Sequence, residues 1–269
     1  MLCERRRDQR GGACRTMEVH VTDKVVVITG GSRGIGRATA IAAAARGYRV
    51  VVGYASNKKA ADEVVAQIEA SNGKAIAVKC DVAEESDILA LFKAADKFGA
   101  LGALVNNGGI VGQSGVRVDE MSAERIQRVM AVNVTGSILC AREAVKRMST
   151  KHGGKGGVIV NLSSVAARLG APNTYVDYAA SKGAVDSFTV GLGYEVANEG
   201  IRVAAIRPGL IDTEIHAAGG EPDRAHRLAH MVPMKRVGTA DEIANAIVWL
   251  LSDEASYVTS AILDVSGGR

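Results

Sequence analysis

Residues 29 to 36 read Thr29-Gly30-Gly31-Ser32-Arg33-Gly34-Ile35-Gly36, between a buried apolar run and an Ala-rich segment. A glycine-rich turn that opens a helix exposes backbone N–H groups and the positive end of the helix dipole, which suits a pyrophosphate. The glycines follow G-x-x-x-G-x-G rather than the more usual G-x-G-x-x-G, and alone they also fit a tight strand-to-helix connection. Their position directly after the first strand favours a nucleotide site.

The rest of the chain alternates short apolar runs with longer helical patterns. The runs are continuously hydrophobic, as in strands covered on both faces, and span residues 25–29, 49–52, 75–80, 103–106, 158–162, 202–206 and 261–265. Helical patterns lie between them, at residues 34–46, 57–71, 84–98, 122–149, 177–199 and 240–252. This alternation predicts an α/β protein with a single-domain Rossmann fold, a doubly wound, seven-stranded parallel sheet with helices on both faces.

Length and charge narrow the class of protein. The 269 residues, 47% hydrophobic and 23% charged, match one large globular domain, and the apolar runs are too short to cross a membrane. The net charge is +4, but five arginines and two acids in residues 1 to 16 account for most of it, which argues against nucleic-acid binding. We expect residues 1–20 to be a mobile extension that is only weakly similar to a transit peptide. Residues 21–269 are expected to form the domain. The protein is expected to be cytoplasmic.

The longest interval without a strand pattern, residues 209–239, is expected to be a partly helical, mobile substrate flap. Its His226 and His230 have the i, i+4 spacing of a metal pair, but a third ligand is not evident, so we expect solvated side chains and no metal. The cysteines have no C-x-x-C spacing, which argues against disulfides. We expect Cys80 and Cys140 to be buried thiols.

A second pattern, Tyr178-Ala179-Ala180-Ser181-Lys182, lies within a predicted helix. Residues four apart share a helix face, so the Lys182 ammonium can approach the Tyr178 phenol. A nearby ammonium favours the phenolate and would lower the pKa of the phenol from about 10 toward neutrality. Because Y-x-x-x-K is common by chance, the pattern alone is weak.

Together these features resemble the short-chain dehydrogenase/reductase family over residues 22–269. The family's landmarks occur in order: the turn at 29–36, Cys80-Asp81-Val82, Asn106-Asn107-Gly108-Gly109, Val132-Asn133-Val134, Asn161-Leu162-Ser163-Ser164, Tyr178 with Lys182, and Arg207-Pro208-Gly209 continuing to Thr213. Among its members, the chain is most similar to bacterial glucose 1-dehydrogenases and 3-oxoacyl-carrier-protein reductases. The resemblance implies an oxidoreductase that moves a hydride between a nicotinamide and a carbonyl or secondary alcohol.

By this resemblance, Tyr178 is the general acid and base, and Lys182 tunes it and binds the nicotinamide ribose. Ser164 holds the carbonyl oxygen, and Asn133 anchors a water in a proton relay. These roles suit the chemistry, because reduction needs both a hydride and a proton for the developing alkoxide. Ser163 competes with Ser164, but alternation along the strand should turn it to the other side.

The resemblance also assigns the cofactor contacts. Asp81 would accept from the adenine amine, with Val82 packing on the ring, and the alternative for Asp81 is to cap the following helix. Asn106 is expected to tie adjacent strands. The expected cofactor-binding residues are Gly30, Ser32, Arg33, Gly34, Ile35, Gly36, Tyr54, Ala55, Ser56, Asn57, Asp81, Val82, Asn107, Gly108, Gly109, Tyr178, Lys182, Pro208, Gly209, Ile211 and Thr213.

NADP (NADPH) is the expected cofactor, and NAD is the less favoured alternative. NAD-specific folds place a carboxylate at the end of the second strand, whereas residues 52–59 contain no acid. Arg33 can pair with a 2′-phosphate, and Ser56 and Asn57 can donate hydrogen bonds to it. If Arg33 lies in solvent instead, the site would accept either cofactor.

Three positions depart from the family pattern. Gly108 stands where alanine is usual, which should loosen the backbone and leave activity intact. The interval from Ser164 to Tyr178 is one position longer than usual, so the substrate pocket can differ. Ser260 stands where glycine is usual, in a segment that commonly packs at a subunit interface.

The sequence does not distinguish between sugars, small ketones, quinones and acyl thioesters as the substrate. A mixed apolar and polar pocket is predicted from Leu169, Tyr175, Ile215, His216, Met231 and Val232. We expect a homotetramer or dimer. A catalytically silent dinucleotide-sensing or scaffold protein on the same fold is the alternative function, although all four catalytic residue types are present.

Overall fold

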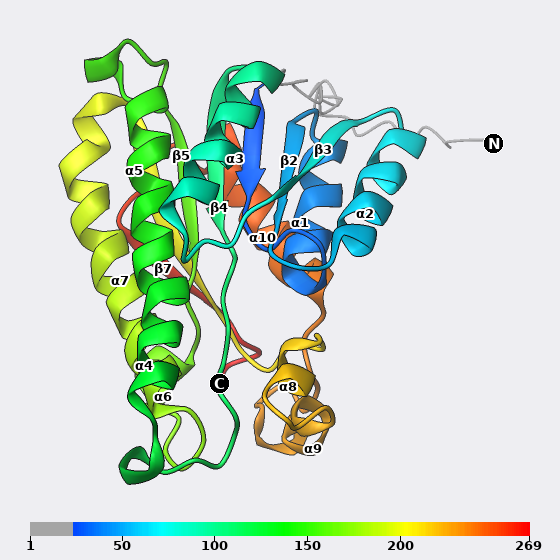
Figure 1. Ribbon diagram of the computed structural model, residues 1–269, viewed down its shortest axis with the longest axis vertical. Helices are drawn as coiled ribbons and strands as arrows, with labels where there is room; N and C mark the ends of the chain where they lie inside the picture. Colours follow the sequence, from blue (N-terminus) through cyan, green and yellow to red (C-terminus); the bar gives the residue numbers. More distant parts are fainter. Residues whose placement is uncertain (1–23) are drawn as a thin grey trace, which may run out of the picture.

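Seven strands form one parallel sheet in the computed structural model, which describes residues 24–269. Their order is β3-β2-β1-β4-β5-β6-β7, with the topological switch between β1 and β4, so the predicted doubly wound fold is confirmed (Figure 1). The expected extension at residues 1–20 lies outside the described residues. No helix among residues 24–269 is long and apolar enough to cross a membrane.

The strands are apolar because the sheet is covered on both faces. They are β1 (Val25–Ile28), β2 (Arg49–Tyr54), β3 (Lys74–Lys79), β4 (Leu101–Asn106), β5 (Gly157–Leu162), β6 (Ile201–Pro208) and β7 (Ala261–Val265). Along β1, Val26 and Ile28 enter the core on one face, and Val25 and Val27 enter the core on the other. β2 runs two residues beyond its predicted end at residue 52, so Tyr54 is a buried strand residue.

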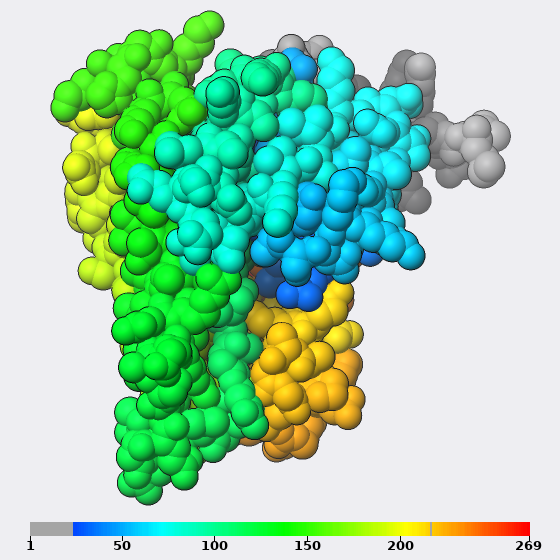
Figure 2. All heavy atoms as spheres, viewed as in Figure 1, coloured from blue at the N-terminus to red at the C-terminus, as the bar shows by residue number. Residues whose placement is uncertain are grey.

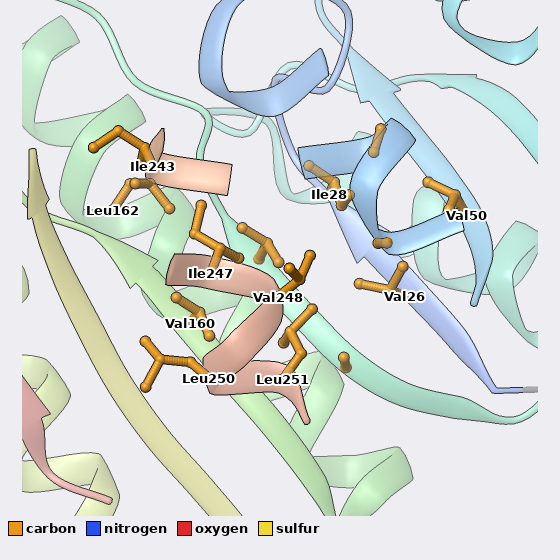
Figure 3. Close-up of a cluster of buried hydrophobic side chains, with 14 of the residues drawn as sticks. Val26, Ile28, Val50, Val160, Leu162, Ile243, Ile247, Val248, Leu250 and Leu251 are labelled. Carbon is orange, nitrogen blue, oxygen red and sulfur yellow. The ribbon is translucent and has the colours of Figure 1, made fainter. Parts of the chain in front are cut away.

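Helices cover the two faces separately. One face carries α1 (Gly34–Ala45), α2 (Lys58–Ala70) and α10 (Ala240–Leu251), and the other carries α3 (Glu85–Phe98), α5 (Gly136–Met148) and α7 (Val176–Val196). Figure 3 shows how α10 is buried: Ile243 and Ile247 lie over Val160 and Leu162 of β5. The carboxyl ends of the central strands stay free of these helices.

The predicted helix at 122–149 is not one regular α-helix. It consists of α4 (Ala123–Met130), a π-helical segment (Ala131–Thr135), and α5. Such π segments are often found at functional sites. The remaining short helices are η1 (Val118–Glu120), η3 (Thr150–His152), α6 (Ala166–Leu169), η4 (Ala197–Glu199), α8 (Ile215–Ala218), α9 (Arg224–Arg227), η5 (Ala229–Met231) and η6 (Asp253–Ala255).

A buried chain of amides joins the two central strands to the helices. Asn106 on β4 and Asn161 on β5 are register partners, and Asn106 Nδ2 donates to Asn161 Oδ1 at 2.9 Å and to Ser137 O at 3.0 Å. Asn161 Nδ2 donates in turn to Thr189 Oγ1 on α7 at 2.9 Å. The predicted strand-tying role of Asn106 is confirmed.

The flap, residues 209–239, forms a lobe beyond the carboxyl edge of the sheet (orange in Figures 1 and 2). It is partly helical as predicted, with α8, α9 and η5. The lobe lies beside the segment that precedes η1, and Ser114 N donates to Gly219 O at 3.0 Å. The flap thus forms one wall of the space beyond β4, β5 and β6.

Candidate active site

A cavity of about 400 Å³ lies between the flap and the carboxyl ends of the central strands. This volume suits a small-molecule site. Of the pocket residues expected from sequence, Leu169, Tyr175, Ile215 and Met231 line it. Val232 does not: it is 2% exposed and packs against the Gly267 backbone.

Tyr178 and Ser164 both line this cavity, where the Ser164 side chain lowers the pKa of the Tyr178 phenol against the effect of burial. Tyr178 comes from the first turn of α7, and Ser164 from the loop after β5, where its Oγ also accepts from Ala166 N at 3.1 Å. Ser163 is 3% exposed, and its Oγ donates to Lys182 O at 3.2 Å. Ser164 is therefore the serine that reaches the phenol, as strand alternation predicts.

Lys182 faces the ring of Tyr178, and its ammonium is held by a carbonyl. Its Nζ lies 5.6 Å from the ring centroid and donates to Leu162 O at 2.5 Å. Burial lowers the pKa of Lys182 to about 8, with Asp186 opposing the shift. Burial also raises the pKa of Tyr178 to about 12, with the Ser164 hydrogen bond opposing. The expected Tyr178 pKa near neutrality is wrong for this structure, because burial outweighs the lowering effects of Ser164 and of the Arg224 charge.

Lys182 should make stability depend on pH, measured against a Lys182→Met variant. Below pH 8 the ammonium is charged in both the folded and the unfolded protein, so its burial cost is fully present. Between pH 8 and 10.5 the folded protein loses the proton first, so the free energy of unfolding rises with pH. Across this window, we expect the free energy of unfolding of wild type to rise by up to about 3 kcal/mol relative to that of the variant. Chemical denaturation at a series of pH values measures the difference. Parallel pH profiles for the two proteins would contradict the lowered pKa.

Asn133 lies in the π segment and is 1% exposed. Its Nδ2 donates to Ile110 O at 2.9 Å and to Ser181 Oγ at 3.0 Å, and its Oδ1 accepts from Ile110 N at 2.8 Å. Ser181 Oγ donates to Tyr178 O at 2.7 Å. Asn133 therefore joins the loop after β4 to the helix that carries Tyr178.

An ion pair that the sequence did not reveal holds the start of α7. Arg125 on α4 donates from Nε to Asp177 Oδ2 at 2.8 Å and from Nη2 to Oδ1 at 3.1 Å. Burial would raise the pKa of Asp177, but the hydrogen bonds from Arg125 and from backbone amides outweigh it, and the pKa is lowered. The pair fixes the turn next to Tyr178. Its partners are 52 positions apart, and no spacing pattern connects them.

The glycine-rich turn is built around Asn107 and Thr29. Asn107 Nδ2 donates to Thr29 O and Gly30 O, both at 2.9 Å, and Thr29 Oγ1 accepts from Asn107 N at 3.1 Å. Gly30 has φ of 62° and Gly34 has φ of 50°, a backbone region that favours glycine. A Cβ on Gly36 would lie 2.3 Å from Gly30 O. The turn therefore requires glycine for both conformation and close approach.

The expected cofactor residues divide between the cavity and the adjoining strand ends. Nine of them line the cavity: Ile35, Asn107, Gly109, Tyr178, Lys182, Pro208, Gly209, Ile211 and Thr213. The others lie at the last residue of β2, in the turns that follow β1, β2, β3 and β4, and in the first turn of α1. Arg33 is exposed, and its side chain makes no hydrogen bond or ion pair with residues 24–269. Ser56 is exposed too, whereas Asn57 caps α2, its Oδ1 accepting from Ala60 N at 3.0 Å.

Asp81 and Val82 follow β3 and have strong partners of their own. Asp81 Oδ2 pairs with Arg128 Nη2 at 2.7 Å, and its Oδ1 accepts from Ala83 N at 3.0 Å. The residue that caps α3 is Glu84, so the alternative of Asp81 as the helix cap is wrong. Val82 is 8% exposed and belongs to the core, which leaves little of its side chain for an adenine ring.

The flap histidines take separate partners. His226 Nε2 lies 3.5 Å from Asp212 Oδ1, and His230 Nδ1 lies 3.0 Å from Arg227 O. Within residues 24–269, no group of three or more His, Cys, Asp and Glu side chains could hold a metal ion.

Cys80 and Cys140 are buried free thiols, as expected, and burial raises the pKa of both. The other two cysteines lie outside the described residues.

Known proteins share this chain's sequence and fold over most of its length. A family model described as enoyl-(acyl carrier protein) reductase matches residues 30–269. A short-chain dehydrogenase from Burkholderia cenocepacia J2315, solved in complex with NADP, is 32% identical, with a TM-score of 0.84 over 92% of this chain and 98% of that one. The chain belongs to the short-chain dehydrogenase/reductase family.

Members of the family with higher identity are bacterial oxidoreductases. The uncharacterized oxidoreductase YgfF of Escherichia coli (strain K12) is 55% identical over 246 residues, which cover 91% of this chain and 99% of that protein. Glucose 1-dehydrogenase 2 of Bacillus subtilis (strain 168) is 41% identical over 249 residues, which cover 92% of this chain and 95% of that protein.

Two departures from the short-chain dehydrogenase/reductase pattern have a local explanation. A Cβ on Gly108 would lie 3.2 Å from Thr29 Oγ1, so glycine relieves a tight contact. Ser260 has φ of 54°, in the left-handed region, which explains why glycine is usual at this position. Its Oγ would lie 2.3 Å from a Cβ on Gly193, so serine at 260 requires glycine on α7.

Proposed function

We propose that the protein is an NADP-dependent oxidoreductase that transfers a hydride between the nicotinamide and a carbonyl or secondary alcohol substrate. The observation that carries this proposal is that Tyr178 and Ser164 line one cavity next to the glycine-rich turn, with the Lys182 ammonium facing the Tyr178 ring. A general acid, an oxygen-binding hydroxyl and a buried cation are the groups that carbonyl reduction requires.

The chain's residues fit a dinucleotide. Arg33, the residue before α1, provides no side-chain cap, so the first N–H groups of the helix are left for an anion. Gly30, Gly34 and Gly36 keep the turn free of side chains. Gly109 lies between Asn133 and Lys182, with room for a ligand to approach the backbone. The reduced nicotinamide supplies the hydride when it is bound.

Tyr178 then acts on the substrate oxygen. Its raised pKa keeps the phenol protonated at neutral pH, so its Oη can donate a proton to the alkoxide that forms on hydride transfer. Ser164 Oγ donates a hydrogen bond to the same oxygen. Lys182 stabilises the phenolate left on Tyr178 and binds the ribose. Asn133 positions α7 through Ser181, and we assign it the water of the proton relay.

Preference for NADP rests on the surroundings of Arg33. The Arg33 side chain is exposed and has no partner among the described residues. It belongs to the turn whose Gly31 N bonds to Gly53 O of β2 at 2.9 Å. The following residues Ser56 and Asn57 present a hydroxyl and an amide rather than a carboxylate. The B. cenocepacia relative solved with NADP is consistent with this choice.

Arg33→Ala should lower kcat/KM for NADPH about tenfold and change it for NADH by no more than about twofold, because only NADPH carries the 2′-phosphate. Initial rates with both cofactors measure the effect. Arg37→Ala is the matched control, since Arg37 is exposed one turn further along and bonds to Gln67 Oε1 at 3.1 Å. A wild-type protein that favours NADH would refute the NADP preference.

The test of the activity itself is turnover of NADPH with a panel of ketones, aldehydes and acyl thioesters. Binding of NADPH without turnover of any of them would favour the dinucleotide-sensing or scaffold alternative. Self-association as a homotetramer or dimer stays a prediction, and it would cover the exposed Ile126, Ile138 and Tyr194 of α4, α5 and α7.

A further inference from the structure

Two arginines that the proposed reaction does not use line the cavity. Arg224, at the start of α9, lies with its guanidinium 5.2 Å from the ring centroid of Tyr175. Its side chain is 15% exposed, and its Nε lies 3.2 Å from Glu221 Oε2. Glu221 also pairs with Arg227 at 3.1 Å, so one carboxylate serves two arginines. The terminal nitrogens of Arg224 make no hydrogen bond to residues 24–269.

Arg269, the last residue of the sequence, reaches the same cavity. Its main-chain oxygen accepts from Arg168 Nη2 and from Ser266 Oγ, both at 3.0 Å, which holds the residue in place. Its Nη1 is buried without a hydrogen-bond partner in the described chain. Burial and the positive charge of Arg224 lower the pKa of Arg269, so the two guanidinium groups are close enough to repel.

The charged side chains that line the cavity are all cationic, and Glu221, which pairs with Arg224, is not among the lining residues. The charged lining residues are Lys182, Arg224 and Arg269, and no Asp or Glu of the described residues lines the cavity. Tyr175 is 5% exposed, and its hydroxyl, also without a partner among the described residues, lies in the same lining. Buried donors without acceptors cost free energy, and a ligand that accepts from them recovers it.

We propose that the substrate carries an anionic group, a carboxylate or a phosphate, that binds to Arg224 and Arg269 with a hydrogen bond from the Tyr175 hydroxyl. The inference rests on the proposed function, because it defines the other end of the molecule whose carbonyl meets Tyr178. The Arg224 guanidinium lies 5.2 Å from the Tyr175 ring, which lies 6.3 Å from the Tyr178 ring, so a short substrate can span the anion site and the proton donor. The substrate class is therefore a short oxo acid or hydroxy acid, or a phosphorylated equivalent.

The phosphates of the dinucleotide do not account for this site. They belong at the glycine-rich turn, which contacts Asn107 and Thr213. Arg224 instead lies beside Tyr175, and Arg269 beside Arg168, which follow and precede residues 170–174. Apolar side chains of Leu169, Leu228 and Met231 also line the cavity and suit a short carbon chain.

The experiment compares short oxo carboxylic acids with their methyl esters in the NADPH-loaded enzyme, because esterification removes the charge and keeps the carbonyl. We expect the wild-type kcat/KM for the acid to be at least about tenfold higher than that for its methyl ester, which is the effect of one charge-assisted hydrogen bond. Arg224→Gln and Arg269→Gln should each bring the ratio of acid to ester close to one, because the charge that distinguishes the acid from its ester is removed. A hydroxyketone phosphate and its free hydroxyketone form a second pair that distinguishes phosphate from carboxylate.

Arg227→Gln is the matched control, because Arg227 shares Glu221 but its side chain is 60% exposed and outside the cavity. Its ratio should equal that of wild type. A wild-type preference for the neutral member of both pairs, or an unchanged ratio in both arginine variants, would overturn the inference while the proposed function stands.

Absence of turnover with every carbonyl, charged or neutral, marks failure of the proposed function instead. A binding measurement then tests the anion site by itself. In calorimetric titration of the NADPH-loaded protein with inorganic phosphate, we expect binding to wild type and to Arg227→Gln but not to Arg224→Gln. Equal binding to all three, or none to wild type, would refute the site.

Discussion

Tyr178→Phe is expected to lower kcat by roughly two to four orders of magnitude and to leave NADPH affinity approximately unchanged. Phenylalanine keeps the ring that faces Lys182 Nζ at 5.6 Å and Tyr175 at 6.3 Å, so the packing of the cavity is preserved. It lacks the Oη whose pKa Ser164 affects and that carries the proton. The loss should therefore fall on the chemical step rather than on binding.

Steady-state rates at saturating NADPH, with fluorescence titration for cofactor affinity, measure the two effects separately. Tyr194→Phe is the matched control, since it makes the same change on α7 at a side chain that is 77% exposed. A Tyr178→Phe variant with more than about a tenth of wild-type turnover would refute the assignment of the proton donor.

Gly36→Ala is expected to weaken NADPH binding by about two orders of magnitude. The new Cβ would lie 2.3 Å from Gly30 O and 2.5 Å from Asn107 Nδ2, and both atoms belong to the hydrogen-bonded frame of the turn. Relief of the clash must move α1 away from β4 or break that hydrogen bond. Either movement displaces the helix N-terminus proposed to meet the pyrophosphate. Overpacking should also cost about 1–3 kcal/mol of stability.

Fluorescence titration and thermal denaturation follow the two consequences. Gly191→Ala is the control for helix propensity, because a Cβ at Gly191, on α7, would meet nothing within 4 Å. That variant should bind NADPH as wild type does. Unchanged cofactor affinity in Gly36→Ala would show that the turn does not hold the dinucleotide.

The sheet could be predicted because burial on both faces leaves a direct trace in the sequence. A strand such as β1, with alternate side chains in two different cores, must be apolar at every position. The glycine-rich turn is equally visible, because Gly30 and Gly36 each meet a constraint that only glycine satisfies. Local requirements of this kind restrict residue type at fixed positions.

Other features of the site depend on contacts that no local pattern records. The helices on either side of the π segment around Asn133 have ordinary α-helical hydrophobic spacing, so the sequence does not reveal the π segment between them. Arg125 and Asp177 meet only after α4 and α7 have packed. Arg269 reaches the cavity only because β7 lies next to β6 in the sheet and ends at the edge where the cavity lies. Such pairs follow from the completed fold and not from spacing.

The pKa of Tyr178 was wrongly predicted for a related reason. A helix places Lys182 near the tyrosine, but the burial of both groups and the Leu162 carbonyl that accepts from the ammonium depend on tertiary packing. Desolvation then exceeds the effects of Ser164 and Arg224, which lower the pKa of the phenol.

The amide chain of Asn106, Asn161 and Thr189 bears on errors made while the protein folds. β4 and β5 are apolar on both faces, so hydrophobic burial distinguishes poorly between correct pairing and a pairing shifted by one residue. A shift of one residue would turn one asparagine to the opposite face and leave buried amides unpaired, at a cost of about 1–3 kcal/mol for each group. The amides therefore favour the native register of the sheet. A shifted pairing, which would carry Ser164 away from Tyr178, is less stable by this cost and does not accumulate as inactive protein.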